Sequence, residues 1–246
     1  MIDYLIAFAA APSIAILGFG FLLGLKHATE ADHLAAVSTI VSERKGLWSS
    51  ALVGGFWGLG HTISLFVAGI FVLLLDFRIG EAAERWLEFA VGVMLTLLGL
   101  NVLRKVINGG IVHFHTHEHG SHLHAHPHVH EHEAAAEPGT HHANRFGARA
   151  VMIGMVHGLA GSGALMLLVI PTIESRVVGM IYVAIFGLGS IGGMMLMSFL
   201  VGLPFHLTAL RFNRYNRVLQ ALAACASIAI GLLIVYEKGF SDRFAA

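Results

Sequence analysis

Gly24-Leu25-Lys26-His27 recurs later in the chain as Gly154-Met155-Val156-His157, and Phe56-Trp57-Gly58-Leu59-Gly60-His61 recurs as Phe186-Gly187-Leu188-Gly189-Ser190. The two landmarks are 34 residues apart in the first copy, from His27 to His61, and 33 apart in the second, from His157 to Ser190. Membrane transporters often contain such weak internal symmetry, because they are built from two copies of one structural repeat. The alternative is chance similarity between glycine-rich membrane helices, but the matched spacing favours a repeat.

Long apolar segments surround these landmarks, and each is long enough to cross the roughly 30 Å of hydrocarbon in a bilayer. They lie at 47–75, 86–106, 148–172, 178–203 and 217–236, and a further apolar stretch at 4–42 precedes them in the sequence. Matching the copies makes 18–42 one span and predicts two three-span repeats, at 18–107 and 148–238. Because three is odd, the second repeat is inverted relative to the first. Residues 1–17 form a short extra apolar segment, so we predict an all-α polytopic membrane protein with six or seven spans.

The composition excludes several other classes of protein. Apolar residues make up 56% of the 246 residues and charged residues only 12%, with a mean hydropathy of +0.75, whereas soluble domains carry about 25% charged residues. A soluble enzyme is therefore excluded. Fifteen Lys and Arg balance fifteen Asp and Glu, which leaves no basic excess for binding a nucleic-acid backbone. The sequence also lacks the P-loop pattern Gly-x4-Gly-Lys-Ser/Thr, so we expect no ATP hydrolysis through such a loop.

Basic residues are unequally divided between the predicted loops on the two sides. Nine lie on one side and five on the other: Arg44, Lys45, Arg104, Lys105, Arg145, Arg149, Arg211, Arg214 and Arg217 against Arg78, Arg85, Arg176, Lys238 and Arg243. The positive-inside rule puts the first group in the cytoplasm. We therefore predict a protein integral to the cell (inner) membrane, with a polar tract at 108–147 in the cytoplasm and the tail, 239–246, outside.

The span at 18–42 contains the string His27-Ala28-Thr29-Glu30-Ala31-Asp32-His33, directly after Lys26. Each ionised group at the bilayer centre costs about 2.5 to 3.5 kcal/mol, so such clusters persist where they line a pathway or bind a ligand. Two carboxylates cancel the charge of a divalent cation, and imidazoles suit late first-row metals better than Mg²⁺ or Ca²⁺. The single Cys225 excludes a thiolate cluster. The alternative is an internally paired polar patch in which Lys26 neutralises one acid.

Helix geometry limits how these side chains meet. On an ideal helix His27, Glu30 and His33 share an arc of about 120°, whereas Asp32 lies about 100° from His33 on the other flank. A straight helix therefore does not bring all four together. Either the helix is distorted near Gly24, or Asp32 orients an imidazole instead of binding the metal.

His61 and His157 occupy landmark positions, and they are the further candidate ligands. A lone membrane histidine often makes only an interhelical hydrogen bond, but inverted repeats tend to build one midplane site from both halves. We expect Ser162 and Ser190 to pack, as most of the methionines do, with Met194 as the one methionine worth testing as a ligand. The predicted metal-binding residues are His27, Glu30, Asp32, His33, His61 and His157.

The polar tract at 108–147 holds twelve of the seventeen histidines, between His113 and His142. Few apolar residues accompany them, so we predict a disordered loop. Dense imidazoles bind late transition ions weakly and exchangeably, which favours a cytoplasmic buffer or hand-off surface. An inert polar linker is the alternative.

Several strings resemble those of the nickel/cobalt transporter (NiCoT) family. Lys26-His27-Ala28-Thr29-Glu30-Ala31-Asp32-His33-Leu34 is similar to the His-x4-Asp-His signature, with Glu30 where the family usually has Asp. Gly58-Leu59-Gly60-His61-Thr62 is similar to the second signature, Leu-Gly-His-Ser/Thr. Larger members have Leu-Gly-Phe-Asp-Thr in the second half. This chain instead has Val156-His157-Gly158-Leu159-Ala160-Gly161-Ser162-Gly163, which resembles the short UreH-type branch, as does Gly187-Leu188-Gly189-Ser190-Ile191.

The resemblance implies selective movement of Ni²⁺ or Co²⁺ across a membrane, with import favoured. The ion is then the transported substrate and no cofactor is needed, the protein is not an enzyme, and the candidate protein partners are a cytoplasmic metallochaperone or urease or hydrogenase maturation proteins. Efflux through the same site stays open, because a His-rich cytoplasmic loop also suits an exporter. A different class, an intramembrane serine hydrolase using Ser162, rests on the bare string Gly161-Ser162-Gly163.

Overall fold

The computed structural model describes residues 2–44, 46–75, 80–108, 113–119, 122–128, 142–160, 175–211 and 213–240. Within these residues the chain forms seven helices and one two-stranded sheet. The helices are α1 (Ile2–His27), α2 (Ala31–Val41), α3 (Leu47–Leu74), α4 (Glu81–Ile107), α5 (His142–Ala160), α7 (Arg176–Arg211) and α8 (Asn213–Gly239). The strands are β1 (His113–His119) and β2 (His122–His128).

Four helices, α3, α4, α7 and α8, are long and apolar enough to cross a membrane. Helices α1 and α2 meet the same criterion together as a pair bent by 55°, which gives a fifth candidate span. Helix α5 offers a shorter apolar segment, Gly147–Ala160. The remainder of the predicted span at 148–172 lies outside the described residues, as does Ser162. All the candidate membrane spans in the described residues are therefore helical, as predicted, while the number of six or seven spans and the repeat arrangement remain predictions.

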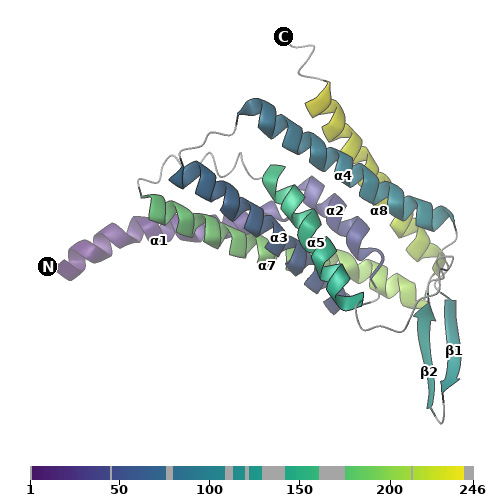
Figure 1. Ribbon diagram of the computed structural model, residues 1–246. Coiled ribbons are helices and arrows are strands. Elements are labelled where there is room, and N and C mark those ends of the chain that lie inside the picture. The colour runs from purple at the N-terminus through teal and green to yellow at the C-terminus, as the bar shows by residue number, and fades with distance from the viewer. Residues whose placement is uncertain are drawn as a thin grey trace.

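The helices pack in pairs through glycines that permit close backbone contact. A Cβ built on Gly24 of α1 would overlap the Phe186 carbonyl of α7, and one built on Gly154 of α5 would overlap the Trp57 carbonyl of α3. Helices α4 and α8 pack against each other (Figure 1), and they contact α5 and α7, respectively, of the group formed by α1, α3, α5 and α7. Small residues at such contacts are typical of membrane helix packing.

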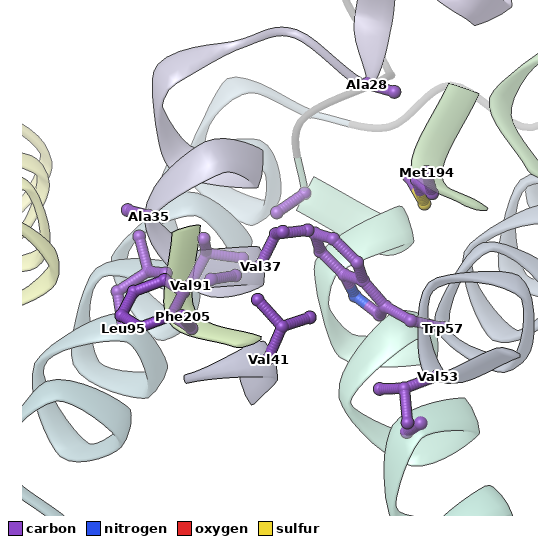
Figure 2. Close-up of a cluster of buried hydrophobic side chains, with 13 residues drawn as sticks. Ala28, Ala35, Val37, Val41, Val53, Trp57, Val91, Leu95, Met194 and Phe205 are labelled. Carbon is purple, nitrogen blue, oxygen red and sulfur yellow. The ribbon is translucent and has the colours of Figure 1, made fainter. Parts of the chain in front are cut away.

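The largest cluster of buried apolar side chains surrounds α2 and Trp57. Helix α2 buries chiefly small side chains, which let α3, α4 and α7 approach it closely. Figure 2 shows the Trp57 side chain reaching from α3 toward Val37 of α2, with Leu95 of α4 and Phe205 of α7 gathered beside the same helix. Because α2 lies inside this apolar cluster, His33 in its first turn is held away from lipid and water.

Substituting Gly24 by alanine is expected to destabilise the protein by about 1 to 3 kcal/mol, because the added methyl group collides with the Phe186 carbonyl. Gly18→Ala is the matched control, since a Cβ there meets no atom within 4 Å. Both changes remove a glycine from the same helix, so their effects on backbone entropy cancel. Thermal unfolding in detergent should show a lower Tm for Gly24→Ala alone. Equal Tm values for the two variants would contradict the close contact between α1 and α7.

The two ends of the chain differ in part from the sequence prediction. Residues 1–17 are predicted as a separate segment, whereas α1 runs without interruption from Ile2 to His27. The alanine-rich stretch at 7–11 favours a continuous helix, which accounts for this difference. At the other end α8 stops at Gly239, and residues 241–246 of the predicted tail lie outside the described residues.

The predicted disordered loop at 108–147 also differs, because 113–128 contains an antiparallel hairpin. The register pairs histidine with histidine at four positions: His113↔His128, His115↔His126, His117↔His124 and His119↔His122. Histidine at every second position matches the two-residue period of a strand, which explains the extended backbone. Figure 1 shows the hairpin projecting from the end of the molecule where α4 stops and α8 begins. The rest of the tract before α5 lies largely outside the described residues.

Candidate metal centre

The centre is built around the break between α1 and α2. The turn at 28–30 is closed by hydrogen bonds from the Thr29 and Glu30 N–H groups to the carbonyls of Lys26 and His27, at 2.9 and 3.1 Å. Glu30 then adopts an extended conformation, with φ −66° and ψ 151°, and α2 begins at Ala31. Broken helices at membrane depth are typical of transporter binding sites. The break places His27 at the end of α1 and both Asp32 and His33 in the first turn of α2.

Three buried histidines form the first group of candidate ligands. His27, His33 and His61 each offer a ring nitrogen, and these three atoms lie within 4.8 Å of one another. The ring centroids are 4.3 Å apart for His27 and His33, and 5.0 Å apart for His27 and His61. All three side chains are 0% exposed. This group therefore joins the end of α1 and the start of α2 to the middle of α3.

Asp32, His33 and His157 form the second group, whose ligand atoms also lie within 4.8 Å of one another. His157 Nε2 lies 3.0 Å from Asp32 Oδ2, and His33 Nδ1 lies 3.1 Å from Asp32 Oδ1. The His33 backbone N–H also donates to Asp32 Oδ1, at 2.8 Å. His33 belongs to both groups, so the two merge into one cluster that includes α5.

The imidazole nitrogens of this cluster are largely without hydrogen-bond partners. Among the described residues, five of these buried nitrogens lack a polar partner: His27 Nε2, His33 Nε2, His61 Nδ1 and Nε2, and His157 Nδ1. Buried polar atoms are normally satisfied in native proteins, and an unsatisfied group calls for a specific explanation such as a missing ion. A bound metal ion would use the lone pairs of several of these nitrogens at once.

Glu30 lies at the edge of the cluster. Its Oε2 is 3.0 Å from His27 Nδ1, and its side chain is 39% exposed, compared with 20% for Asp32. Lys26 is exposed, and within the described residues it forms no ion pair with either carboxylate. The alternative in which Lys26 neutralises one acid is therefore not supported.

Two aromatic side chains that the sequence prediction missed border the cluster. The Trp57 ring centroid lies 5.3 Å from that of His33 and 5.4 Å from that of His157. Phe186 approaches His27, at 5.7 Å. Both residues stand four positions before the second landmark residue of their half, His61 or Ser190. Their equivalent positions in the two repeats are the sequence feature from which both aromatic residues could have been predicted. They are completely or almost completely buried and exclude water from the histidines.

Ser190 and Met194 are the remaining candidates in the second half of the chain. Ser190 and Met194 are both 0% exposed, and the Met194 sulfur faces Gly58 within the apolar cluster around Trp57. The Ser190 hydroxyl has no hydrogen-bond partner. Met194, the one methionine singled out for testing as a ligand, thus lies among apolar side chains.

Comparison with known proteins identifies relatives of similar length and longer ones. The chain is 36% identical over 234 residues to the urease accessory protein UreH of Bacillus sp. (strain TB-90), covering 93% of this chain and 94% of UreH. The Arabidopsis thaliana chloroplast proteins FOR GROWTH AND FERTILITY 2 and FOR GROWTH AND FERTILITY 1 are 24% and 26% identical over 90% of this chain, which spans 56% and 59% of their lengths. No protein-family model and no solved structure matches the chain.

Proposed function

This chain belongs to the UreH-type branch of the nickel/cobalt transporter (NiCoT) family, and we propose that it transports Ni²⁺ or Co²⁺ across a membrane as a secondary transporter. The observation that carries the proposal is the cluster of four buried histidines around Asp32, in which five imidazole nitrogens have no polar partner among the described residues. Such a cluster is costly between apolar helices unless it binds an ion. Neutral imidazoles suit Ni²⁺ and Co²⁺ better than Mg²⁺ or Ca²⁺.

Asp32 sets which nitrogens face the ion. An ionised carboxylate only accepts hydrogen bonds, so the N–H groups of His33 Nδ1 and His157 Nε2 point toward Asp32. The opposite nitrogens, His33 Nε2 and His157 Nδ1, are then unprotonated and free to bind metal. With His27 and His61 they make four imidazole ligands, while Asp32 and Glu30 supply the two negative charges that balance a divalent cation. This arrangement favours Asp32 as the residue that orients the ligands.

The transport mechanism we infer is alternating access between two inverted three-helix repeats. Glycines at equivalent positions of the two repeats make equivalent contacts. Gly24 packs against the Phe186 carbonyl, and its counterpart Gly154 packs against the Trp57 carbonyl. Likewise Gly189 meets the Phe21 carbonyl as Gly60 meets the Val151 carbonyl. Residues of both halves, His27 and His157 among them, contribute to the cluster. Rocking of one half against the other would then open the site to each side in turn.

Import is the direction we propose, with the His-rich tract in the cytoplasm. Two contacts join helices on the side of the molecule that is rich in basic residues. Lys105 Nζ pairs with Glu43 Oε1 at 3.2 Å, and Gln220 Nε2 donates to the Ser42 carbonyl at 3.1 Å. Basic residues collect on the cytoplasmic side of membrane proteins. The tract would receive the imported ion and pass it to a metallochaperone or to urease or hydrogenase maturation proteins. No cofactor and no enzymatic step are needed.

Radiometal flux into proteoliposomes tests the proposal directly. Purified protein should accumulate ⁶³Ni²⁺ or ⁵⁷Co²⁺ well above empty vesicles, because four neutral imidazoles favour late first-row ions. Imidazole also suits Zn²⁺, so Zn²⁺ is the comparison metal that measures selectivity. Repeating the assay with and without a pH gradient identifies coupling to protons. Loading the vesicles with metal and following its release distinguishes export from import. Accumulation no greater than in empty vesicles for every metal would contradict transport.

A further inference from the structure

A cavity of about 270 Å³ lies beside the break between α1 and α2. Four charged side chains line it, Glu30, Asp32, Glu88 and Lys238, together with apolar residues of α4, α5 and α8. Charged groups around a cavity between membrane helices are costly, and they mark ion pathways. The cavity is therefore a candidate route by which an ion reaches the histidine cluster.

Two carboxylates connect the cavity to the cluster. Asp32 lines the cavity and also contacts His33 and His157, at 3.1 and 3.0 Å. Glu30 lines it and lies 3.0 Å from His27. Both carboxylates are partly exposed, whereas these histidines are fully buried. An ion in the cavity can thus reach the imidazoles by passing from oxygen to nitrogen ligands.

An ion pair between α4 and α8 forms another part of the cavity wall. Lys238 Nζ lies 2.6 Å from Glu88 Oε2, and these side chains are 36% and 24% exposed. Glu88 stands in the second turn of α4 and Lys238 in the last turn of α8. These helix ends lie on the side opposite to the His-rich hairpin (Figure 1), which is the predicted outside.

The charges of the four side chains match a divalent cation. Three carboxylates and one ammonium leave two negative charges, which attract one Ni²⁺ or Co²⁺. While the two side chains are paired, the Lys238 ammonium neutralises the Glu88 carboxylate, which is the first carboxylate that an ion arriving from outside would reach. The ammonium must leave this carboxylate before the carboxylate can bind metal.

We propose that the Glu88–Lys238 ion pair is the outer gate of the metal site. An arriving divalent cation binds Glu88 and displaces the Lys238 ammonium toward solvent, and the ion then moves through the cavity to Asp32 and Glu30. The ion pair re-forms behind it. The gate rests on the proposed transport function and adds the pair that controls access to the site.

Concentration-dependent ⁶³Ni²⁺ uptake by proteoliposomes tests the gate with two opposite variants. Glu88→Gln removes the receiving carboxylate and should raise the KM about tenfold, since local charge controls the ion concentration in a cleft. Lys238→Met removes the competing ammonium and should lower the KM, while Mg²⁺ becomes an effective competitor. Glu237→Gln is the matched control because Glu237 is exposed, next to Lys238 in sequence, and its KM should equal that of the wild type.

An ion pair that merely joined α4 to α8 would give a different result. Both variants would then lower the Tm and Vmax in parallel and leave the KM unchanged, and that outcome overturns the gate. If wild-type vesicles accumulate nickel and the variants share its KM, the gate is wrong while transport stands. If wild-type vesicles accumulate no nickel, the transport function fails and the gate fails with it.

Discussion

Replacing His33 by alanine is expected to reduce nickel uptake into proteoliposomes by more than about 100-fold. His33 is the residue that joins the two ligand groups, and its ring centroid lies 4.3 Å from that of His27 and 4.1 Å from that of His157. Removing the imidazole takes one ligand from each group. It also leaves Asp32 Oδ1 without its imidazole partner, so the carboxylate no longer holds the cluster together. Initial rates of ⁶³Ni²⁺ uptake measure the effect.

His206→Ala provides the control for this loss. His206 lies on α7, is half-buried and stands outside both ligand groups, so the same substitution there should leave the uptake rate unchanged. The Tm in detergent and the amount of protein reconstituted are measured for both variants, which separates lost ligands from lost folding. Uptake by His33→Ala at the wild-type rate, with equal protein in the vesicles, would show that nickel does not pass through the cluster.

Asp32→Asn is expected to weaken nickel binding and uptake by about 10- to 100-fold. Asparagine keeps the size of the side chain but replaces one acceptor by an N–H donor, which then faces an imidazole N–H. One of the two histidines must therefore change tautomer, and the nitrogen it presents to the metal becomes protonated. The negative charge next to the ion is lost as well. Titration calorimetry with Ni²⁺ on detergent-purified protein gives the affinity, and vesicle uptake gives the rate.

Glu30→Gln separates the roles of the two carboxylates. Glu30 contacts one histidine and is more exposed than Asp32, which contacts two, so the neutral variant should lose less than about tenfold in affinity. If Glu30→Gln lowers the nickel affinity as much as or more than Asp32→Asn does, the two assignments are reversed. Glu30 would then be the principal charge on the ion, and Asp32 would be a structural link between α2 and α5.

The transmembrane character of this chain and much of its candidate site are readable from the sequence. Apolar length predicts helices α3, α4, α7 and α8, because a bilayer requires continuous hydrophobic segments. The density of ionisable residues from His27 to His33 predicts a functional cluster, since isolated charges are not tolerated at that depth. His61 and His157 follow from the repeat, and the structure places both beside His33.

The break in the first span is less visible in the sequence. The turn residues Ala28, Thr29 and Glu30 include neither glycine nor proline, so no local signal interrupts the helix. The sequence prediction offered a distortion near Gly24, but α1 continues past Gly24 and ends at His27. Gly24 serves instead for close contact with α7. The break becomes favourable because hydrogen bonds within the turn satisfy its backbone groups, while Ala28 is buried against the neighbouring helices.

Three features can be read from the linear chain: the apolar segments of membrane length, the two copies of a motif, and a set of histidines and carboxylates that are costly to place in lipid unless they bind a ligand. Which of these side chains come into contact depends on how the helices pack in three dimensions. Asp32 contacts His157 across 125 residues, and Glu88 contacts Lys238 from the far end of the chain. Local periodicity determines which face of a helix is apolar, whereas such contacts depend on how the helices cross. Those crossings follow from the close packing of glycines such as Gly24 and Gly154 against the backbones of other helices.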